Sequence, residues 1–436
     1  MTDFHAKYPV ASQLLDFIDA SPSPFHCVAT VEKQLETQGF VELNEHESWP
    51  KPLPECFYVK RNESSIAAFM VPEGAHVSHG FLLAGAHTDS PCLRLKNKGE
   101  YSAHGYRQLG VEMYGGALQH TWVDRDLSVS GRLVVQQEEG ERSTLLVSHE
   151  TPLIRIPNLA IHLNPEANKK IKFNPQSELT PIVGIGEEEC LLTVLSNQVG
   201  VDVQDILAVE LFAHVTEPSQ FWGSQGEFIA APRLDNQAMC YSILQGFLEG
   251  MENDPGKIQG ISFFDNEEIG SQTLQGANSN FLESLLERIS SSFDASRDEY
   301  LTSLANSFFI SADMAHALHP NYASSHDPNH FPEINKGPVI KSNANFRYAT
   351  DARTLVAFQD LCDSVNVPCQ NFINRSDLGC GSTIGPMTSA RLGIRSIDVG
   401  TPQFAMHSAR ESAGSLDPDY MNTVFSQYFG FGVTMI

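Results

Sequence analysis

The chain has few cysteines, and none of them forms a C-x-x-C pair. Eight cysteines among 436 residues are too sparse for a disulfide-stabilised scaffold, so we expect reduced thiols in a reducing compartment. Because the cysteine spacing of structural zinc sites is missing, any bound metal has to be held by His, Asp and Glu. The chain also lacks an apolar run of the roughly 20 residues that a membrane-spanning helix needs.

Basic residues are scarce as well. The chain has 28 Lys and Arg against 53 Asp and Glu, which gives a formal net charge of −25. Such a surface repels nucleic acid and anionic membranes, so we expect neither as a partner. The excess of acid accounts for solubility and identifies no substrate. The first residues contain no basic segment followed by an apolar core, so we predict a cytoplasmic protein without a secretory signal.

Helical and strand patterns alternate along two separate parts of the chain. VASQLLDFIDAS, AMCYSILQGFLEG and FLESLLERISSSF have helical apolar spacing, while GFLLAGAH, GISFFDN and NSFFISA are typical of buried strands. Between these parts, short alternating stretches such as DLSVSGRLVVQQ and VELFAHVTE indicate a β-rich module. We therefore predict an α/β domain, a sheet flanked by helices, formed by 1–92 and 233–436. It is interrupted by a β-rich insert at 93–232.

Polar side chains that can bind metals follow several of the predicted strands or open a helix. They occur in AGAHTDSP, APRLDNQ, FFDNEEIG, ISADMAHA and FAMHSARE. The residues concerned are His87, Asp235, Glu267, Glu268, Asp313 and His407. Because ligands of open α/β sheets collect beyond the carboxyl ends of the strands, one crevice can hold all six groups.

This combination of residue types fits a hydrolytic centre with two metal ions. Two His and three carboxylates are ligands suited to zinc, cobalt or manganese. A shared carboxylate can hold two cations roughly 3.5–4 Å apart. The adjacent Glu267 and Glu268 can divide two tasks, one as ligand and one as general base. Asp89 lies two residues beyond His87 and can fix the orientation of the imidazole.

Each of these features also has an ordinary structural explanation. A His at a strand end is commonly a hydrogen-bonded structural residue, and an Asp at a helix start is commonly an N-cap. Glu-Glu pairs are commonly solvated. The metal-site interpretation depends on all of these residues following apolar strands, where a solvated surface is not expected.

The same motifs, together with SADMAHALHPNY and CGSTIGP, resemble those of the M18 metallopeptidases, the aspartyl aminopeptidase family. Their order and separations also match over nearly the whole chain. The resemblance implies a zinc-aminopeptidase-like mixed sheet flanked by helices, with the insert serving oligomerisation. It further implies a two-metal exopeptidase that acts on peptides with a free N-terminus and assembles as a homo-oligomer, a tetrahedral dodecamer.

The resemblance also assigns roles to individual residues. It makes Asp235 the bridging ligand of two divalent ions, zinc in the first place, with cobalt or manganese as alternatives. Glu268 and His407 complete one metal site, and His87 and Asp313 complete the other. Glu267 becomes the general base. Asp89 orients His87.

Substrate contacts are implied in the same way. Lys341 matches a position suited to the side-chain carboxylate of an N-terminal Asp or Glu, and Tyr348 and His316 match other pocket positions. His162 matches a histidine that related enzymes place in the active site of a neighbouring subunit. From the residues alone, a solvated Lys341, a packed Tyr348 and a structural His316 are the favoured interpretations, and a core His on a strand is the alternative for His162. Cys380, in CGSTIGP, has no arranged His–Asn partner in the sequence, so we do not predict a thiol nucleophile.

Three rival functions stay open. A related two-metal hydrolase such as an aminoacylase would use the same metals without a site for a free amine. A neutral-residue aminopeptidase of the same family would lack the acidic preference. A non-catalytic assembly or cargo protein would need no active site. The complete set of ligands and Glu267 argues against such a loss of catalysis.

Overall fold

The structure is a computed structural model that describes residues 3–137, 140–169, 172–186, 190–253 and 255–434. Its centre is a nine-stranded mixed sheet in the order β1-β2-β3-β13-β4-β14-β18-β16-β17. The strands of this sheet are, in chain order, β1 (Val41–Glu42), β2 (Cys56–Arg61), β3 (Ser65–Met70), β4 (Phe81–His87), β13 (Ile258–Phe264), β14 (Phe308–Ala312), β16 (Val339–Ser342), β17 (Gln370–Ile373) and β18 (Arg395–Gly400). The predicted mixed α/β sheet is confirmed.

The middle of this sheet consists of parallel strands. β13, β4, β14 and β18 run side by side in parallel, and every residue of β4 and β13 is buried. The continuous apolar stretch FLLAGA is what a strand with both faces covered requires. Because these strands are parallel and adjacent, their carboxyl ends meet at one edge of the sheet.

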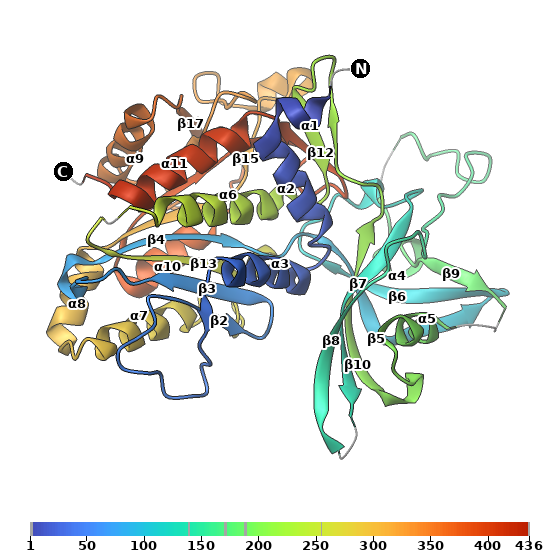
Figure 1. Cartoon of the computed structure of the whole chain (residues 1–436). Helices are drawn as coiled ribbons and strands as arrows, with labels where there is room; N and C mark the ends of the chain where they lie inside the picture. The colour runs from blue at the N-terminus through green and yellow to red at the C-terminus, as the bar shows by residue number, and fades with distance from the viewer. Residues whose placement is uncertain (1–2, 138–139, 170–171, 187–189, 254, 435–436) are drawn as a thin grey trace.

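Helices cover both faces of the nine-stranded sheet (Figure 1). One face is packed by α2 (Pro9–Asp19), α3 (Pro24–Thr37), α6 (Leu234–Gly250), α9 (Ala352–Ser364) and α11 (Asp417–Phe431). The other is packed by α7 (Phe281–Ser292), α8 (Arg297–Ala305) and α10 (Ile384–Leu392). A short helix, α1 (Phe4–Lys7), precedes α2. The start of α3 shows how the sequence sets these elements: Ser23 accepts a hydrogen bond from the His26 amide, and Pro24 occupies the first turn.

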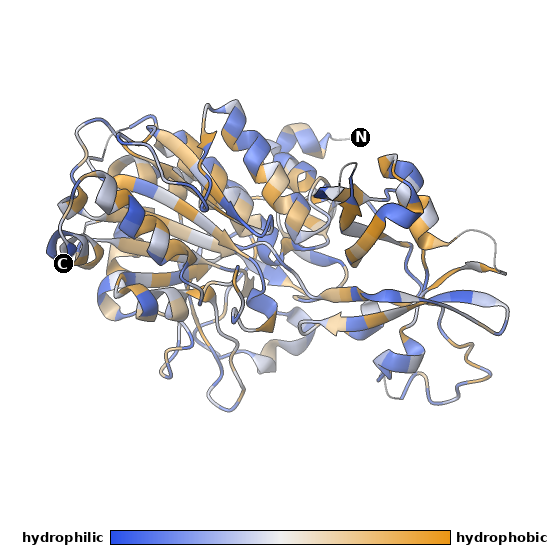
Figure 2. Cartoon of the chain, turned by 90° about the horizontal axis from the view of Figure 1, so that it is seen from below, coloured by the Kyte–Doolittle hydropathy of each residue, from blue (hydrophilic) through white to orange (hydrophobic). Residues whose placement is uncertain are grey.

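A second, antiparallel sheet lies beside the first, with its own apolar core (Figures 1 and 2). Its order is β8-β7-β10-β5-β6-β9. The strands are β5 (Cys92–Ala103), β6 (Tyr106–Tyr114), β7 (Leu127–Gln136), β8 (Arg142–Ser148), β9 (Ile182–Ile185) and β10 (Ile206–Val215), accompanied by the helices α4 (Pro175–Glu178) and α5 (Leu191–Val199). Apart from Cys92, these residues fall within the predicted β-rich insert.

A third sheet joins the end of the predicted insert to the C-terminal part of the chain. Its order is β11-β12-β20-β19-β15. The strands are β11 (Gln220–Trp222), β12 (Phe228–Ala231), β15 (Ala315–His316), β19 (Pro402–Phe404) and β20 (Glu411–Gly414). Residues 220–231 therefore pair with the C-terminal segment, although the sequence grouped them with the insert. The division into two domains remains our proposal.

All eight cysteines are free thiols, in agreement with the sequence prediction. Within the described ranges, no helix combines the length and the apolar character needed to cross a membrane.

Candidate metal centre

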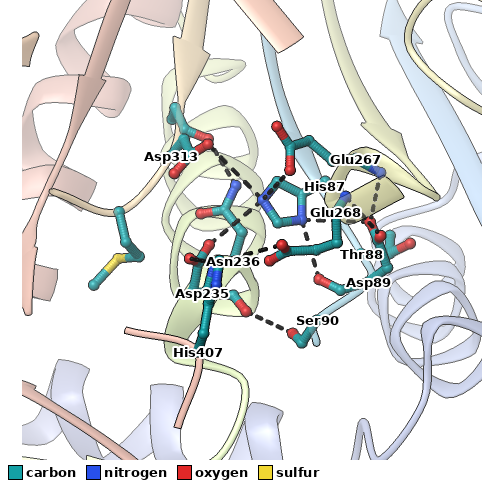
Figure 3. A network of polar contacts seen from close by, with 12 residues as sticks. His87, Thr88, Asp89, Ser90, Asp235, Asn236, Glu267, Glu268, Asp313 and His407 are labelled. Atoms are coloured by element: carbon teal, nitrogen blue, oxygen red, sulfur yellow. Dashed lines mark hydrogen bonds and ion pairs between the residues drawn. The ribbon is translucent and has the colours of Figure 1, made fainter. Parts of the chain in front are cut away.

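Three of the predicted strand ends meet at one edge of the central sheet (Figure 3). His87 is the last residue of β4, and Asp313 directly follows β14. Glu267 and Glu268 lie in the 3₁₀ turn η5 (Glu267–Ile269), just beyond β13. Because β13, β4 and β14 are parallel neighbours, these four side chains come together as the sequence predicted.

Asp235 and His407 reach the same point from other elements. Asp235 lies in the first turn of α6 with non-helical backbone angles, and His407 lies in the loop between β19 and β20 with a φ of 69°. The Glu411 carboxylate joins these two segments. It accepts the Asp235 N–H at 3.0 Å through one oxygen and the His407 N–H at 2.7 Å through the other.

The two oxygens of Asp235 face different histidines. Oδ1 lies 3.4 Å from His87 Nε2, and Oδ2 lies 3.5 Å from His407 Nε2. His87 Nε2 is also 3.9 Å from Asp313 Oδ2, and His407 Nε2 is 3.4 Å from Glu268 Oε2. Three groups of side chains have possible ligand atoms within 4.8 Å of one another: His87–Asp235–Asp313, Asp235–Glu268–His407 and His87–Glu267–Glu268. Asp235 is common to the first two groups.

The side chains present fit divalent cations. Asp235 is only 3% exposed, yet its Oδ1 accepts no hydrogen bond from the described residues. A buried carboxylate oxygen without a donor is costly unless a cation or a proton compensates its charge. Imidazole nitrogens and carboxylate oxygens are the ligands of catalytic zinc sites, and they also suit cobalt and manganese.

The electrostatics of the cluster point in the same direction. Burial raises the pKa of the Glu267 carboxyl to about 8, with His87 opposing the shift and the charges of Asp313 and Asp89 adding to it. Burial and the neighbouring Asp235 raise the pKa of Glu268 well above its usual range. Burial also disfavours ionisation of Asp235, but the His407 and His87 rings, 3.5 and 3.4 Å from its oxygens, hold its pKa below the usual range. Such crowded carboxyls favour a bound cation.

Asp89 supports more than the His87 ring. The His87 Nδ1 atom lies 3.0 Å from the Asp89 backbone oxygen and 3.4 Å from the Asp89 carboxylate. The carboxylate itself accepts the N–H groups of Glu267 at 3.1 Å and Glu268 at 3.2 Å. It also accepts the Tyr114 hydroxyl at 2.6 Å. Asp89 therefore fixes the backbone of the glutamate pair as well as contacting the imidazole.

A pocket of about 470 Å³ opens beside the cluster. Lys341, Tyr348 and His316 all line it, together with residues of the CGSTIGP motif. Lys341 is only 3% exposed. Its Nζ atom donates to the Met314 carbonyl at 2.9 Å and lies 3.2 Å from Asp313 Oδ1. The predicted solvated-Lys alternative is therefore wrong, because the ammonium group is buried and paired.

His162 and Cys380 lie apart from the ligand cluster. His162 is exposed in a turn at 161–163, so the alternative of a core His on a strand is wrong. It is absent from the described lining of the pocket. The Cys380 thiol donates to the Tyr348 hydroxyl at 3.3 Å, and this contact gives it no activating base.

Two functional candidates escaped the sequence reasoning. Glu411 is buried and accepts the N–H groups of Asp235 and His407, and Tyr114 belongs to β6 of the second sheet. Both lie in motifs that the sequence displays, AMHSARE and VEMYGG. A buried Glu shortly after a His ligand, and a Tyr-Gly-Gly turn at the end of a strand, are the signals that could have found them.

A mixed α/β sheet with imidazole and carboxylate groups gathered at one edge defines a metal-site α/β protein. A family model described as "Aminopeptidase I zinc metalloprotease (M18)" matches residues 17–429. The chain belongs to this family, the M18 zinc aminopeptidases. The resemblance drawn from the motifs is thereby confirmed.

Known proteins resemble the chain over almost its whole length. A Pseudomonas fluorescens (strain Pf0-1) protein named "Probable M18 family aminopeptidase 2" is 43% identical over 423 residues, 95% of this chain and 97% of that protein. The structure described as "Cryo-EM structure of the Ape4 and Nbr1 complex" aligns with a TM-score of 0.95 and 39% identity, over 99% of this chain and 87% of that one. "Structure of S. cerevesiae mApe1 dodecamer" aligns with a TM-score of 0.86 and 28% identity, over 98% and 97%.

Proposed function

We propose that this metalloaminopeptidase uses two metal ions, zinc in the first place, to remove N-terminal residues from peptides, with a preference for Asp and Glu. The observation that carries the proposal is the position of Asp235. Its carboxylate belongs to the two groups His87–Asp235–Asp313 and Asp235–Glu268–His407, and it directs one oxygen toward His87 and the other toward His407. A carboxylate shared in this way is what a two-metal site requires.

The ligands divide into two sets around Asp235. His87 and Asp313 would complete one site, and Glu268 and His407 the other. When bound, the two ions supply Lewis-acid chemistry that activates water, polarises the scissile carbonyl and anchors a free α-amine. An anchored amine explains why a blocked or internal residue would not be removed.

Glu267 is the proposed general base. Its carboxylate oxygen lies 3.9 Å from His87 Nε2, at the wall of the pocket. Glu267 accepts a proton from the attacking water and then gives it to the leaving amine. The amide of Glu267 is fixed by Asp89, so the base keeps a constant position relative to the ligands.

Replacing Glu267 tests the chemistry. We expect Glu267→Gln to keep the zinc content and the assembly of the wild type but to lower kcat by at least about 100-fold, the scale of general-base catalysis. Glu252→Gln, at an exposed position, is the matched control and should leave kcat unchanged. Near-normal turnover by Glu267→Gln would remove the assigned role, and faster cleavage of N-acetylated than of free substrates would favour an aminoacylase.

The acidic preference depends on Lys341. Its buried ammonium group lies in the pocket beside the ligands, where a substrate carboxylate can share it with Asp313. A charge-assisted hydrogen bond contributes about 1.5–3 kcal/mol. Its loss in Lys341→Met should therefore lower kcat/KM for N-terminal Asp and Glu about 10- to 100-fold relative to Leu.

A panel of aminoacyl anilides measures this ratio, and the exposed Lys33→Met is the control. A fall of the same size for Leu substrates would instead assign Lys341 to the support of Asp313. The chain would then be a neutral-residue aminopeptidase of the M18 family.

We also propose that the chain assembles as a homo-oligomer. The mApe1 relative described above is a dodecamer, and His162 would act in the active site of a neighbouring subunit as a donor to the oxyanion. The exposed turn that carries His162 supports this arrangement.

A further inference from the structure

A segment of the second sheet contacts the candidate metal centre of its own chain. It consists of residues 114–121, from the last residue of β6 onward, and we call it the YGG segment. The Tyr114 hydroxyl donates to Asp89 Oδ2 at 2.6 Å. The Gly116 carbonyl accepts the His407 Nδ1–H at 3.2 Å. Two further hydrogen bonds, Leu118 N–H to the His407 carbonyl and Ala409 N–H to Thr121 Oγ1, both at 2.9 Å, close the contact.

The buried Tyr114 hydroxyl is held by two hydrogen bonds, one donated and one accepted. Tyr114 is 6% exposed, and its oxygen accepts the Asn266 side-chain amide at 2.9 Å while its proton goes to Asp89. Burial and the Asp89 charge raise the pKa of the Tyr114 phenol, so the hydroxyl stays protonated. The Asp89 carboxylate that receives this proton also holds the amides of Glu267 and Glu268. Tyr114 thus acts on the glutamate pair through Asp89.

Gly116 sets the state of the His407 ring. A carbonyl oxygen can only accept, so its hydrogen bond requires the proton on Nδ1, and in the neutral imidazole this tautomer leaves Nε2 available to a cation. Nε2 is the atom that faces Asp235 at 3.5 Å and Glu268 at 3.4 Å. A backbone carbonyl behind an imidazole is a common way of fixing a metal-binding histidine.

The two glycines allow the backbone to come this close. At Gly115, which has a φ of +67°, a Cβ atom would lie 3.1 Å from the Glu268 Cβ. At Gly116 it would lie 3.3 Å from His407 Nδ1. These contacts are tighter than usual, so Glu268 or His407 would have to shift by a few tenths of an ångström to admit either side chain.

We infer that the YGG segment positions the metal ligands and the base within each chain, with Tyr114 and Gly116 as its positioning residues. The inference rests on the proposed function. It gives the second sheet a task beyond assembly, because these contacts are complete in a single chain. Both residues act through Asp89 and His407, and neither touches the reacting atoms.

Tyr114→Phe tests the inference on the full-length purified protein, with Tyr106→Phe as the control. Tyr106 lies in the same strand and is 46% exposed. The readouts are zinc content, the zinc dissociation constant from competition with a chelator, and kcat and KM separately. We expect Tyr114→Phe to raise the dissociation constant about 10- to 100-fold and to lower kcat by a similar factor, the usual effect of losing a group behind a metal ligand. KM should change little, and Tyr106→Phe should match the wild type.

Gly116→Ala tests the second contact and decides the matter if Tyr114→Phe does not fold. We expect weaker zinc binding than in Gly379→Ala, a control position where a Cβ meets nothing within 4 Å. A wild type that binds no zinc would overturn the proposed function itself. A wild type that binds zinc, together with variants that bind it equally well, would overturn only the role of the YGG segment.

Discussion

The ligand cluster and the turn that carries His162 differ in almost every physical respect. In the cluster, His87 and Asp235 are 1% and 3% exposed, and hydrogen bonds within the chain fix the surrounding backbone. The turn at 161–163 is exposed and places Ile161 and Leu163, 49% and 71% exposed, in solvent. Exposed apolar side chains close together commonly mark a contact with another molecule. All six side chains of the proposed metal centre therefore come from one chain, whereas we propose that the exposed turn contacts a neighbouring chain.

Removing His162 should give the largest effect among the tests of this comparison. His162→Ala is expected to lower kcat by about 100- to 1,000-fold, the effect of losing one donor to an oxyanion. Zinc content should be unchanged, because the turn lies outside the cluster. Steady-state kinetics and elemental analysis measure the two quantities.

Mixed assemblies show whether His162 acts on another chain. Co-assembly of equal amounts of His162→Ala and Glu267→Gln chains should restore about a quarter of the wild-type activity, because a site then combines Glu267 of one chain with His162 of its neighbour. Activity no higher than that of either variant alone would mean that His162 does not act in the active site of a neighbouring chain.

Within the buried cluster, Glu411→Gln should have a smaller effect, which is on zinc binding. An amide offers one accepting oxygen, so the N–H of either Asp235 or His407 would face an NH₂ group. We expect the zinc dissociation constant to rise about 10- to 100-fold. Chelator competition measures it, with the exposed Glu333→Gln as the control. Identical zinc affinities in the two variants would show that the hydrogen bonds to Glu411 are not needed to position Asp235 and His407.

The smallest effect concerns the free energy of unfolding that depends on the burial of His214 in the second sheet. His214, in β10, is 7% exposed, and burial together with Arg233 lowers its pKa to about 3. The unfolded chain binds a proton near pH 6.5, so the stability contribution of neutral His214 is complete above that pH and is lost as the pH falls toward 3. Between pH 6.5 and 5 this loss is about 2 kcal/mol.

Denaturant unfolding at several pH values compares the wild type with His214→Gln. The wild type should lose stability faster than the variant between pH 6.5 and 5. If the free energies of unfolding of the two proteins change with pH in parallel, His214 is solvated and its part of the second sheet is not tightly packed.

The sequence was most informative about the four residues of the cluster that lie at or just beyond the end of a strand. Mostly apolar strands such as FLLAGA and ISFF are easily identified, and the parallel order of β13, β4 and β14 brings their ends together. His87, Glu267 and Asp313 could therefore be predicted as neighbours from one sequence. The central sheet and its helices followed from the same alternation.

Contacts between distant segments could not be predicted in this way. Nothing in the local pattern reveals that Glu411 accepts the amide of Asp235, 176 residues away. Likewise, β12 pairs with β20 across the chain, which moved residues 220–231 away from the insert. The burial of Lys341 against Asp313 also depends on the packing of two strands. Such pairings depend on tertiary structure, which periodicity does not encode.

The number of metal ions bound per chain tests the central claim most directly. The purified protein would be stripped with a chelator and titrated with zinc while activity and bound zinc are measured together. We predict that activity is lost on stripping and returns fully when two ions are bound per chain, with Asp235→Asn binding both weakly. A stripped protein that keeps full activity, or one saturated by a single ion, would contradict the shared role of Asp235.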